Sequence, residues 1–164
     1  MVAVYSFIWL MVCVLLQVLV FNHLHLWGGI VLIYMLPLIK MPVQLARSLQ
    51  IFLGFACGLI VDIFSNSPGM HALTCTLTMW MRLPLLHMFV ISDDIKSGAL
   101  GKNLKGMPLY ARFTTLIVAL HVIVLYLIES FSLFNLVPLL IRLIVTMSLT
   151  VLFTLVVEAV GRDQ

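Results

Sequence analysis

Long apolar segments recur along nearly the whole chain, and only short polar connections separate them. A run of about 20 apolar residues is long enough to cross the hydrocarbon core of a bilayer. The first run, Val2–Phe21, contains no charged residue. Charged residues make up only 9% of the 164 residues, whereas a soluble domain needs about a quarter to cover its surface. The surface of this protein is therefore expected to face membrane lipid.

The apolar segments predict helices rather than strands. Inside a bilayer every backbone polar group must be bonded within the protein, which leaves helices and closed barrels. The strict alternation of polar and apolar residues that a barrel requires is not present. We expect an all-α membrane protein whose residues 1–164 form one domain, a compact bundle of six transmembrane helices. The predicted segments are about 2–21, 26–41, 49–64, 71–91, 112–134 and 136–160.

The second segment, about 26–41, is the shortest and leaves the number of spans open. It could be re-entrant, and five true spans with the N-terminus outside would also satisfy the charges. Six spans are preferred because the Lys40 side chain can extend along a short helix to reach the interface. The first segment is expected to remain as an anchor, since it is too long for the core of a cleaved signal peptide.

Basic residues predict the orientation, because they concentrate on the cytoplasmic side of membrane proteins. One alternating topology places eight of the nine basic residues inside, and both termini are then cytoplasmic. The polar loop Ser92–Met107 is predicted to lie inside, where its lysines and Arg112 could hold anionic lipid head groups or a cytoplasmic partner. Arg82, just before Pro84, is expected to extend toward the inner interface. Arg142 is the exception, because it lies near the outer side.

The third segment carries a stripe of small residues that ends in an acid. Gly54, Gly58 and Asp62 are four residues apart, so they share one face of a helix. Glycines at this spacing let a neighbouring helix approach closely. Asp62 then faces protein, where a carboxylate requires a partner. Arg142 and Glu129 are predicted at similar depth, and we expect a buried Asp62–Arg142–Glu129 cluster. It could lock the bundle together or shape a cleft for a ligand or a partner helix.

A polar stretch follows the acid and predicts a tight hairpin at the outer interface. Pro68 and Gly69 stand in the order that a type II turn requires, and Ser65 and Asn66 can satisfy the last carbonyls of the preceding helix. The third and fourth segments should therefore pack as an antiparallel pair.

The sequence carries no pattern typical of an enzyme, a cofactor site or a nucleic-acid interface. It contains no G-x-S-x-G or H-E-x-x-H motif, and no second membrane aspartate that could pair with Asp62. The cysteines, Cys13, Cys57 and Cys75, lie within apolar segments and are interpreted as buried. His121, in the middle of a segment, is interpreted as a buried hydrogen-bonding residue rather than a proton relay.

The stretch G58-L-I-V-D-I-F-S-N-S-P-G-M-H-A-L resembles the signature of the rod shape-determining protein MreD family. Members show Gly-x-x-x-Asp-x-x-Ser followed by a glycine-containing turn, and here Gly58, Asp62, Ser65 and Gly69 occupy those places. The resemblance extends in layout over the whole chain and in individual residues from about Gly54 to Leu73. It implies an architecture similar to the substrate-binding S-components of energy-coupling-factor transporters.

The resemblance implies a non-enzymatic subunit of the cell-elongation machinery in the bacterial inner membrane. Members of the family bind the scaffold protein MreC, and work with MreB, the RodA glycosyltransferase and a class B penicillin-binding protein in peptidoglycan synthesis. The alternative is an S-component-like transporter subunit that binds a small molecule. That function would need a roomy polar pocket near the outer face, which Asp62, Glu129, Arg142 and Gln17 could help to line.

Overall fold

The regular structure of this protein consists of helices. The computed structural model describes residues 2–21, 28–89, 107–130 and 136–162, and within these ranges no strand is found. The prediction of an all-α protein is confirmed. The helices are α1 (Val2–Leu19), α2 (Met35–Lys40), α3 (Arg47–Ser65), α4 (Met70–Phe89), α7 (Met107–Glu129) and α8 (Leu136–Arg162).

Three of these helices are long and apolar enough to cross a membrane. They are α3, α7 and the part of α8 from Val137 to Gly161. Helix α1 contributes a shorter apolar stretch, Phe7–Leu19. Helices α3, α7 and α8 expose large apolar side chains, among them Phe52, Ile63, Leu127 and Leu152. A membrane protein is therefore supported, while the number of six spans stays a prediction.

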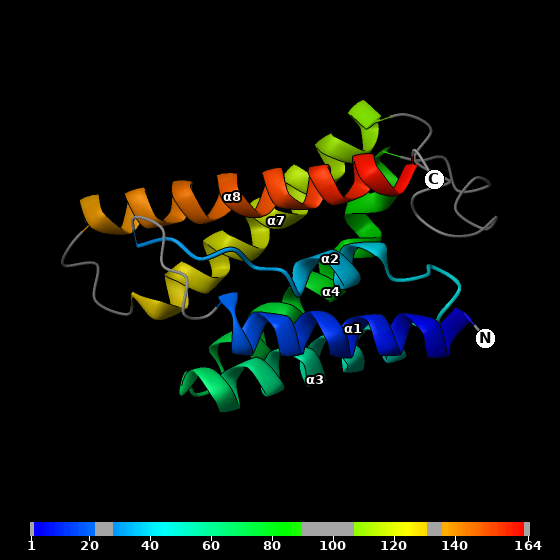
Figure 1. Ribbon diagram of the computed structural model, residues 1–164, viewed down its shortest axis with the longest axis horizontal. Coiled ribbons are helices and arrows are strands. Elements are labelled where there is room, and N and C mark those ends of the chain that lie inside the picture. The colour runs from blue at the N-terminus through cyan, green and yellow to red at the C-terminus, as the bar shows by residue number, and fades with distance from the viewer. Residues whose placement is uncertain (1, 22–27, 90–106, 131–135, 163–164) are drawn as a thin grey trace.

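Each helix packs on the next around residues 30–41, which we call the central segment. Helix α1 contacts α3, α3 contacts α4, α4 contacts α7, and α7 contacts α8. Figure 1 shows α1 and α3 side by side along one edge and α7 and α8 along the opposite edge. Helix α2 lies between them and contacts both α1 and α7.

The prediction that residues 26–41 form one helix is wrong. Among the described residues of this segment only Met35–Lys40 are helical. Residues 30–32 have no regular secondary structure and run as an extended trace in Figure 1, and residues 33–34 form a turn. The local sequence is consistent with this, since Ile30 and Val31 are β-branched and favour extended backbone. Pro37 lies in the first turn of α2, where it is tolerated. Met41 has φ −56° and ψ 135°, as the residue before Pro42 should.

A stripe of polar side chains on α8 satisfies the amides of this extended stretch. Thr146 and Thr150 accept hydrogen bonds from the backbone N–H groups of Ile30 and Leu32, both at 3.1 Å. From the other side, Gln17 of α1 accepts the N–H of Ile33 at 2.7 Å. Irregular backbone is tolerated at membrane depth only where protein surrounds it. That condition is met, because residues 31–39 are all buried.

The other end of the central segment is also held by polar side chains. Lys40 forms a 2.8 Å ion pair with the buried Glu158 of α8, and its side chain stays partly exposed. Arg82 of α4 is fully buried, so its predicted extension toward the inner surface is wrong. Its guanidinium donates to the carbonyls of Ile39 and Met41 at the end of α2 and to Oε1 of Gln50. These carbonyls have no intrahelical partner, which is why a buried donor is tolerated here.

Candidate functional site

Asp62 closes the hairpin between α3 and α4. Its carboxylate accepts three hydrogen bonds: from the Ser67 hydroxyl at 2.8 Å, from the His71 N–H at 2.9 Å and from the Ala72 N–H at 2.8 Å. The two amides belong to the first turn of α4, whose N–H groups have no partner within the helix. A negative charge at a helix N-terminus is also favoured by the helix dipole. Asp62 is only 5% exposed, and these bonds explain why the buried charge is tolerated.

The glycine stripe of α3 packs on α4, as predicted. A Cβ atom added to Gly58 would lie 2.4 Å from the backbone carbonyl oxygen of His71. A Cβ added to Gly54 would lie 2.5 Å from Cγ of Met79. At Gly58 the obstacle is backbone that cannot move aside, so the missing side chain is what brings the amides of α4 within reach of Asp62.

The turn that joins the two helices uses two residues with positive φ. Asn66 ends α3 in the left-handed conformation, with φ 52°, and its N–H bonds the carbonyl of Asp62. Gly69 has φ 79°, the sign that the third position of a type II turn requires. Pro68 is exposed between them. The predicted tight hairpin is confirmed, although the left-handed role of Asn66 was not anticipated.

The expected three-residue cluster is divided into two parts. Arg142 and Glu129 do pair, with 3.4 Å between Nη1 and Oε1, but both side chains are nearly half exposed. Arg142 is not among the partners of Asp62, so the predicted Asp62–Arg142 pair is wrong. The sequence placed these residues at one depth, but it did not reveal that the start of α4 satisfies the acid locally.

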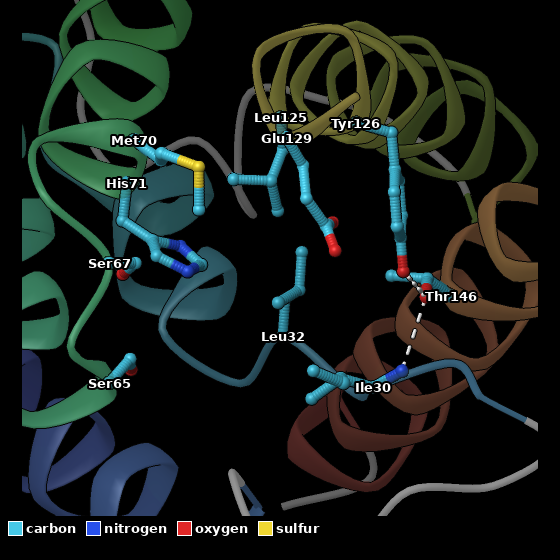
Figure 2. Close-up of a pocket in the computed structure, with 10 residues that line it drawn as sticks. All are labelled: Ile30, Leu32, Ser65, Ser67, Met70, His71, Leu125, Tyr126, Glu129 and Thr146. Carbon is cyan, nitrogen blue, oxygen red and sulfur yellow. Dashed lines mark hydrogen bonds between the residues drawn. The ribbon is translucent and has the colours of Figure 1, made fainter. Parts of the chain in front are cut away.

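A cavity of about 350 Å³ lies between the turn, α4, α7 and α8, and we call it the hairpin cavity. Figure 2 shows the imidazole of His71 and the carboxylate of Glu129 pointing into the same open space from opposite sides. Its volume lies within the range of small-molecule sites, roughly 300–1,000 Å³. The lining residues are Ile30, Leu32, Ser65, Ser67, Met70, His71, Leu125, Tyr126, Glu129 and Thr146.

A chain of hydrogen bonds leads from this cavity into the core. Nδ1 of His71 lies 3.0 Å from the Tyr34 hydroxyl, which lies 2.9 Å from Nε2 of His121. Nδ1 of His121 in turn lies 2.9 Å from the hydroxyl of Thr78. Tyr34 and His121 are fully buried. The interpretation of His121 as a buried hydrogen-bonding residue is confirmed.

Several residues of the site were not identified from the sequence. His71 lies within the signature stretch but was not given a role there, Tyr34 lies outside it, and only the fold brings the two side chains together. Thr146, Thr150, Thr154 and Glu158 did leave a signal, because polar residues repeat every four positions in an otherwise apolar segment. Such spacing indicates one buried polar face. Gln17, expected as a possible pocket residue, serves the backbone of Ile33 instead.

The structure describes no group of three or more His, Cys, Asp or Glu side chains arranged to hold a metal ion, within the ranges given above. Cys13, Cys57 and Cys75 are buried and unpaired by disulfides, as interpreted from the sequence. The loop Ser92–Met107, predicted to face the cytoplasm, lies outside the described residues except for Met107. Comparison of the chain with protein-family models, with curated proteins and with solved structures gave no match.

Proposed function

We propose that this protein is a non-enzymatic, multi-pass subunit of the bacterial inner membrane. It holds an MreC-like scaffold protein of the cell-elongation machinery, in the manner of the MreD family. The wider complex would include MreB, RodA and a class B penicillin-binding protein. Both termini are placed in the cytoplasm by the distribution of basic residues.

The observation that carries this proposal is the structural role of the residues on which the resemblance rests. Gly58 admits the backbone of α4, Asp62 binds its first amides, and Gly69 supplies the positive φ of the turn. Ser65 lines the adjacent hairpin cavity. A signature found by chance would have no reason to build one compact unit. Here three separated residues, Gly58, Asp62 and Gly69, serve one hairpin and Ser65 lines the cavity beside it, which supports treating the four as a family motif.

Co-purification with the scaffold protein tests the function. The full chain, tagged and expressed with the MreC-like protein of the same genome, is expected to retain that protein in mild detergent. A matched pair of variants makes the test specific: Asp62→Asn perturbs the hairpin, whereas Ser148→Ala changes an exposed residue of α8. Retention by Ser148→Ala and loss by a folded Asp62→Asn would assign the hairpin to partner binding. No retention by the unaltered chain would refute the adaptor function.

A second function is favoured by the hairpin cavity. An S-component-like subunit of a transporter would need a roomy pocket with polar groups, and this cavity has an acid, a histidine and several hydroxyl groups along its walls. Two of its residues, Ser65 at the end of α3 and Ser67 in the turn, lie at the end of the hairpin that the basic residues predict to face outward. The discriminating result is retention of an energising ATPase module, rather than a scaffold and cell-wall synthases, in the same purification.

A further inference from the structure

The direction of each hydrogen bond beside the hairpin cavity follows from one threonine. The Thr78 hydroxyl donates its hydrogen to the carbonyl of Thr74 at 2.8 Å. A hydroxyl carries only one hydrogen. Towards Nδ1 of His121 the Thr78 oxygen must therefore act as an acceptor, so His121 carries its proton on Nδ1.

The directions of the next two hydrogen bonds, between His121 and Tyr34 and between Tyr34 and His71 in the cavity wall, follow in the same way. An uncharged imidazole with a proton on Nδ1 has a lone pair on Nε2, and at His121 this lone pair accepts the hydroxyl hydrogen of Tyr34. The Tyr34 oxygen can then only accept from Nδ1–H of His71. Uncharged His71 is left with a lone pair on Nε2, for which no described residue supplies a donor. The chain of bonds thus fixes His71 as a hydrogen-bond acceptor.

The charges around the cavity favour a cation. Its lining contains one acid, Glu129, and no lysine or arginine. Asp62 lies directly behind the wall, bonded to the backbone of His71 and the hydroxyl of Ser67. Arg142 neutralises only part of this charge, since its Nη1 lies 3.4 Å from Oε1 of Glu129 and both side chains are nearly half exposed. No described residue donates to Oε2 of Glu129.

The hydroxyls of Ser67, Tyr126 and Thr146 in the lining already take part in hydrogen bonds within the protein. Ser67 donates to Asp62, and Thr146 accepts the amide of Ile30 and bonds the Tyr126 hydroxyl. A carboxylate and an imidazole nitrogen are stronger acceptors than a hydroxyl oxygen, so the two strongest acceptors among these lining side chains are Glu129 and Nε2 of His71, one negative and one neutral. Both point into the same space in Figure 2.

We propose that the hairpin cavity binds a primary ammonium group, which donates N–H bonds to Oε2 of Glu129 and Nε2 of His71. A primary ammonium carries three donors and a positive charge, and so matches both acceptors. The group can belong to a small water-soluble amine or to the headgroup of an aminophospholipid. This binding activity goes beyond the scaffold-holding function, and it would supply the ligand class if the transporter function were correct.

Thermal unfolding of the purified full chain in detergent tests the site without any partner protein. Ethanolamine, which is protonated at neutral pH, is expected to raise the unfolding temperature in a saturable manner, because a ligand that binds only the folded state stabilises it. Ethylene glycol lacks the charge and choline lacks the N–H donors, and neither should reproduce the shift. An equal response to choline would overturn the proposed hydrogen-bonded recognition.

Three substitutions test which residues of the hairpin cavity bind ethanolamine. Glu129→Gln should raise the half-saturating concentration at least about tenfold, because a charge-assisted bond is lost. His71→Asn keeps an N–H donor near the position of Nδ1 for Tyr34, but removes the Nε2 acceptor, so binding should weaken although the hydrogen-bond chain persists. Arg142→Gln should have the opposite effect, because it frees Glu129 from its competing cation. Unchanged half-saturation in Glu129→Gln and in a folded His71→Asn would refute the site.

A lipid experiment separates the two sources of the ammonium group. The full chain is extracted from bilayers that contain equal phosphatidylethanolamine and phosphatidylglycerol, and the retained lipid is identified by native mass spectrometry. Selective retention of phosphatidylethanolamine, lost in Glu129→Gln, would assign the headgroup. Binding of ethanolamine without lipid selectivity would assign a soluble amine. If the protein binds neither ethanolamine nor phosphatidylethanolamine, the proposal is overturned. Co-purification with the scaffold protein is a separate result, which tests the proposed function.

Discussion

The carboxylate of Asp62 lies 2.8 Å from the backbone N–H of Ala72, ten residues further along the chain. This bond joins the last turn of α3 to the first turn of α4, across the turn that reverses the chain. The hairpin is therefore closed by a side chain and by backbone amides, not by a pair of opposite charges. Substitutions can distinguish these two arrangements.

Asp62→Ala should lower the free energy of unfolding by about 2–4 kcal/mol, since hydrogen bonds to a charged group contribute roughly 1.5–3 kcal/mol each and are not additive. Asp62→Asn should lower the free energy of unfolding by less, because its side-chain oxygen still accepts a hydrogen bond from one of the two amides. Unfolding in detergent, followed by circular dichroism, gives both values. Equal stability of Asp62→Ala and the unaltered protein would contradict the capping role.

Arg142→Ala combined with Asp62→Ala should show additive losses within about 0.5 kcal/mol, as expected for residues that share no partner. Glu129→Ala with Arg142→Ala is the matched comparison, because those two side chains do pair. A coupling energy above about 1 kcal/mol between Asp62 and Arg142 would restore the ion pair predicted from the sequence.

The glycines of α3 should differ in their tolerance of a methyl group. Gly58→Ala is expected to be the most destabilising, because its Cβ would meet the backbone of His71 at 2.4 Å. Gly54→Ala should be milder, since the Met79 side chain can move. Gly161→Ala is the control, because no described atom lies within 4 Å of its Cβ. Melting temperatures in detergent should follow this order, and a stable Gly58→Ala would argue against close packing of α3 on α4.

Two threonines of α8, Thr150 and Thr154, provide a matched pair of substitutions. Thr150→Val removes the acceptor of the Leu32 amide and should cost about 1–3 kcal/mol, the penalty for an unsatisfied buried group. Thr154→Val removes a hydroxyl whose hydrogen bond among the described residues goes to the carbonyl of Thr150 in its own helix, so its effect should be under about 1 kcal/mol. Denaturant titration compares the two variants, and equal losses would show that the extended stretch does not depend on Thr150.

The orientation of the chain can be tested with cysteines on either side of α3. Gln44 and Pro68 are exposed near its two ends, and each is replaced by Cys in a background without Cys13, Cys57 and Cys75. An impermeant thiol reagent added to intact cells should label only Pro68→Cys, because the basic residues predict that the turn faces outward. Labelling of Gln44→Cys alone would reverse the topology.

The features that local sequence determines were predictable. Apolar length predicted the helices, the spacing of Gly54, Gly58 and Asp62 predicted one packed face, and Pro68-Gly69 predicted the turn. Each depends on neighbours within a few residues, so a single chain without its fold is sufficient to infer it.

The features that depend on distant partners were not predictable. The partner of Asp62 was misassigned because charge was considered and free backbone amides were not. The apolar residues of the central segment predict a helix, and nothing local shows that Thr146 and Thr150 satisfy its amides. Arg82 was placed at the interface for the same reason, since the carbonyls of Ile39 and Met41 come from a distant part of the chain.

The bonds from Ile30 and Leu32 to α8 also set an order for biogenesis. Their acceptors lie 116 and 118 residues later in the chain, so a ribosome finishes nearly the whole protein before either acceptor exists. Until then these two amides would be unsatisfied in hydrocarbon, at a cost of several kcal/mol each. The central segment must therefore wait near the membrane surface or among solvating groups while the other helices insert. Its docking closes the assembly, and a chain that stops before Thr146 has no route to the native state.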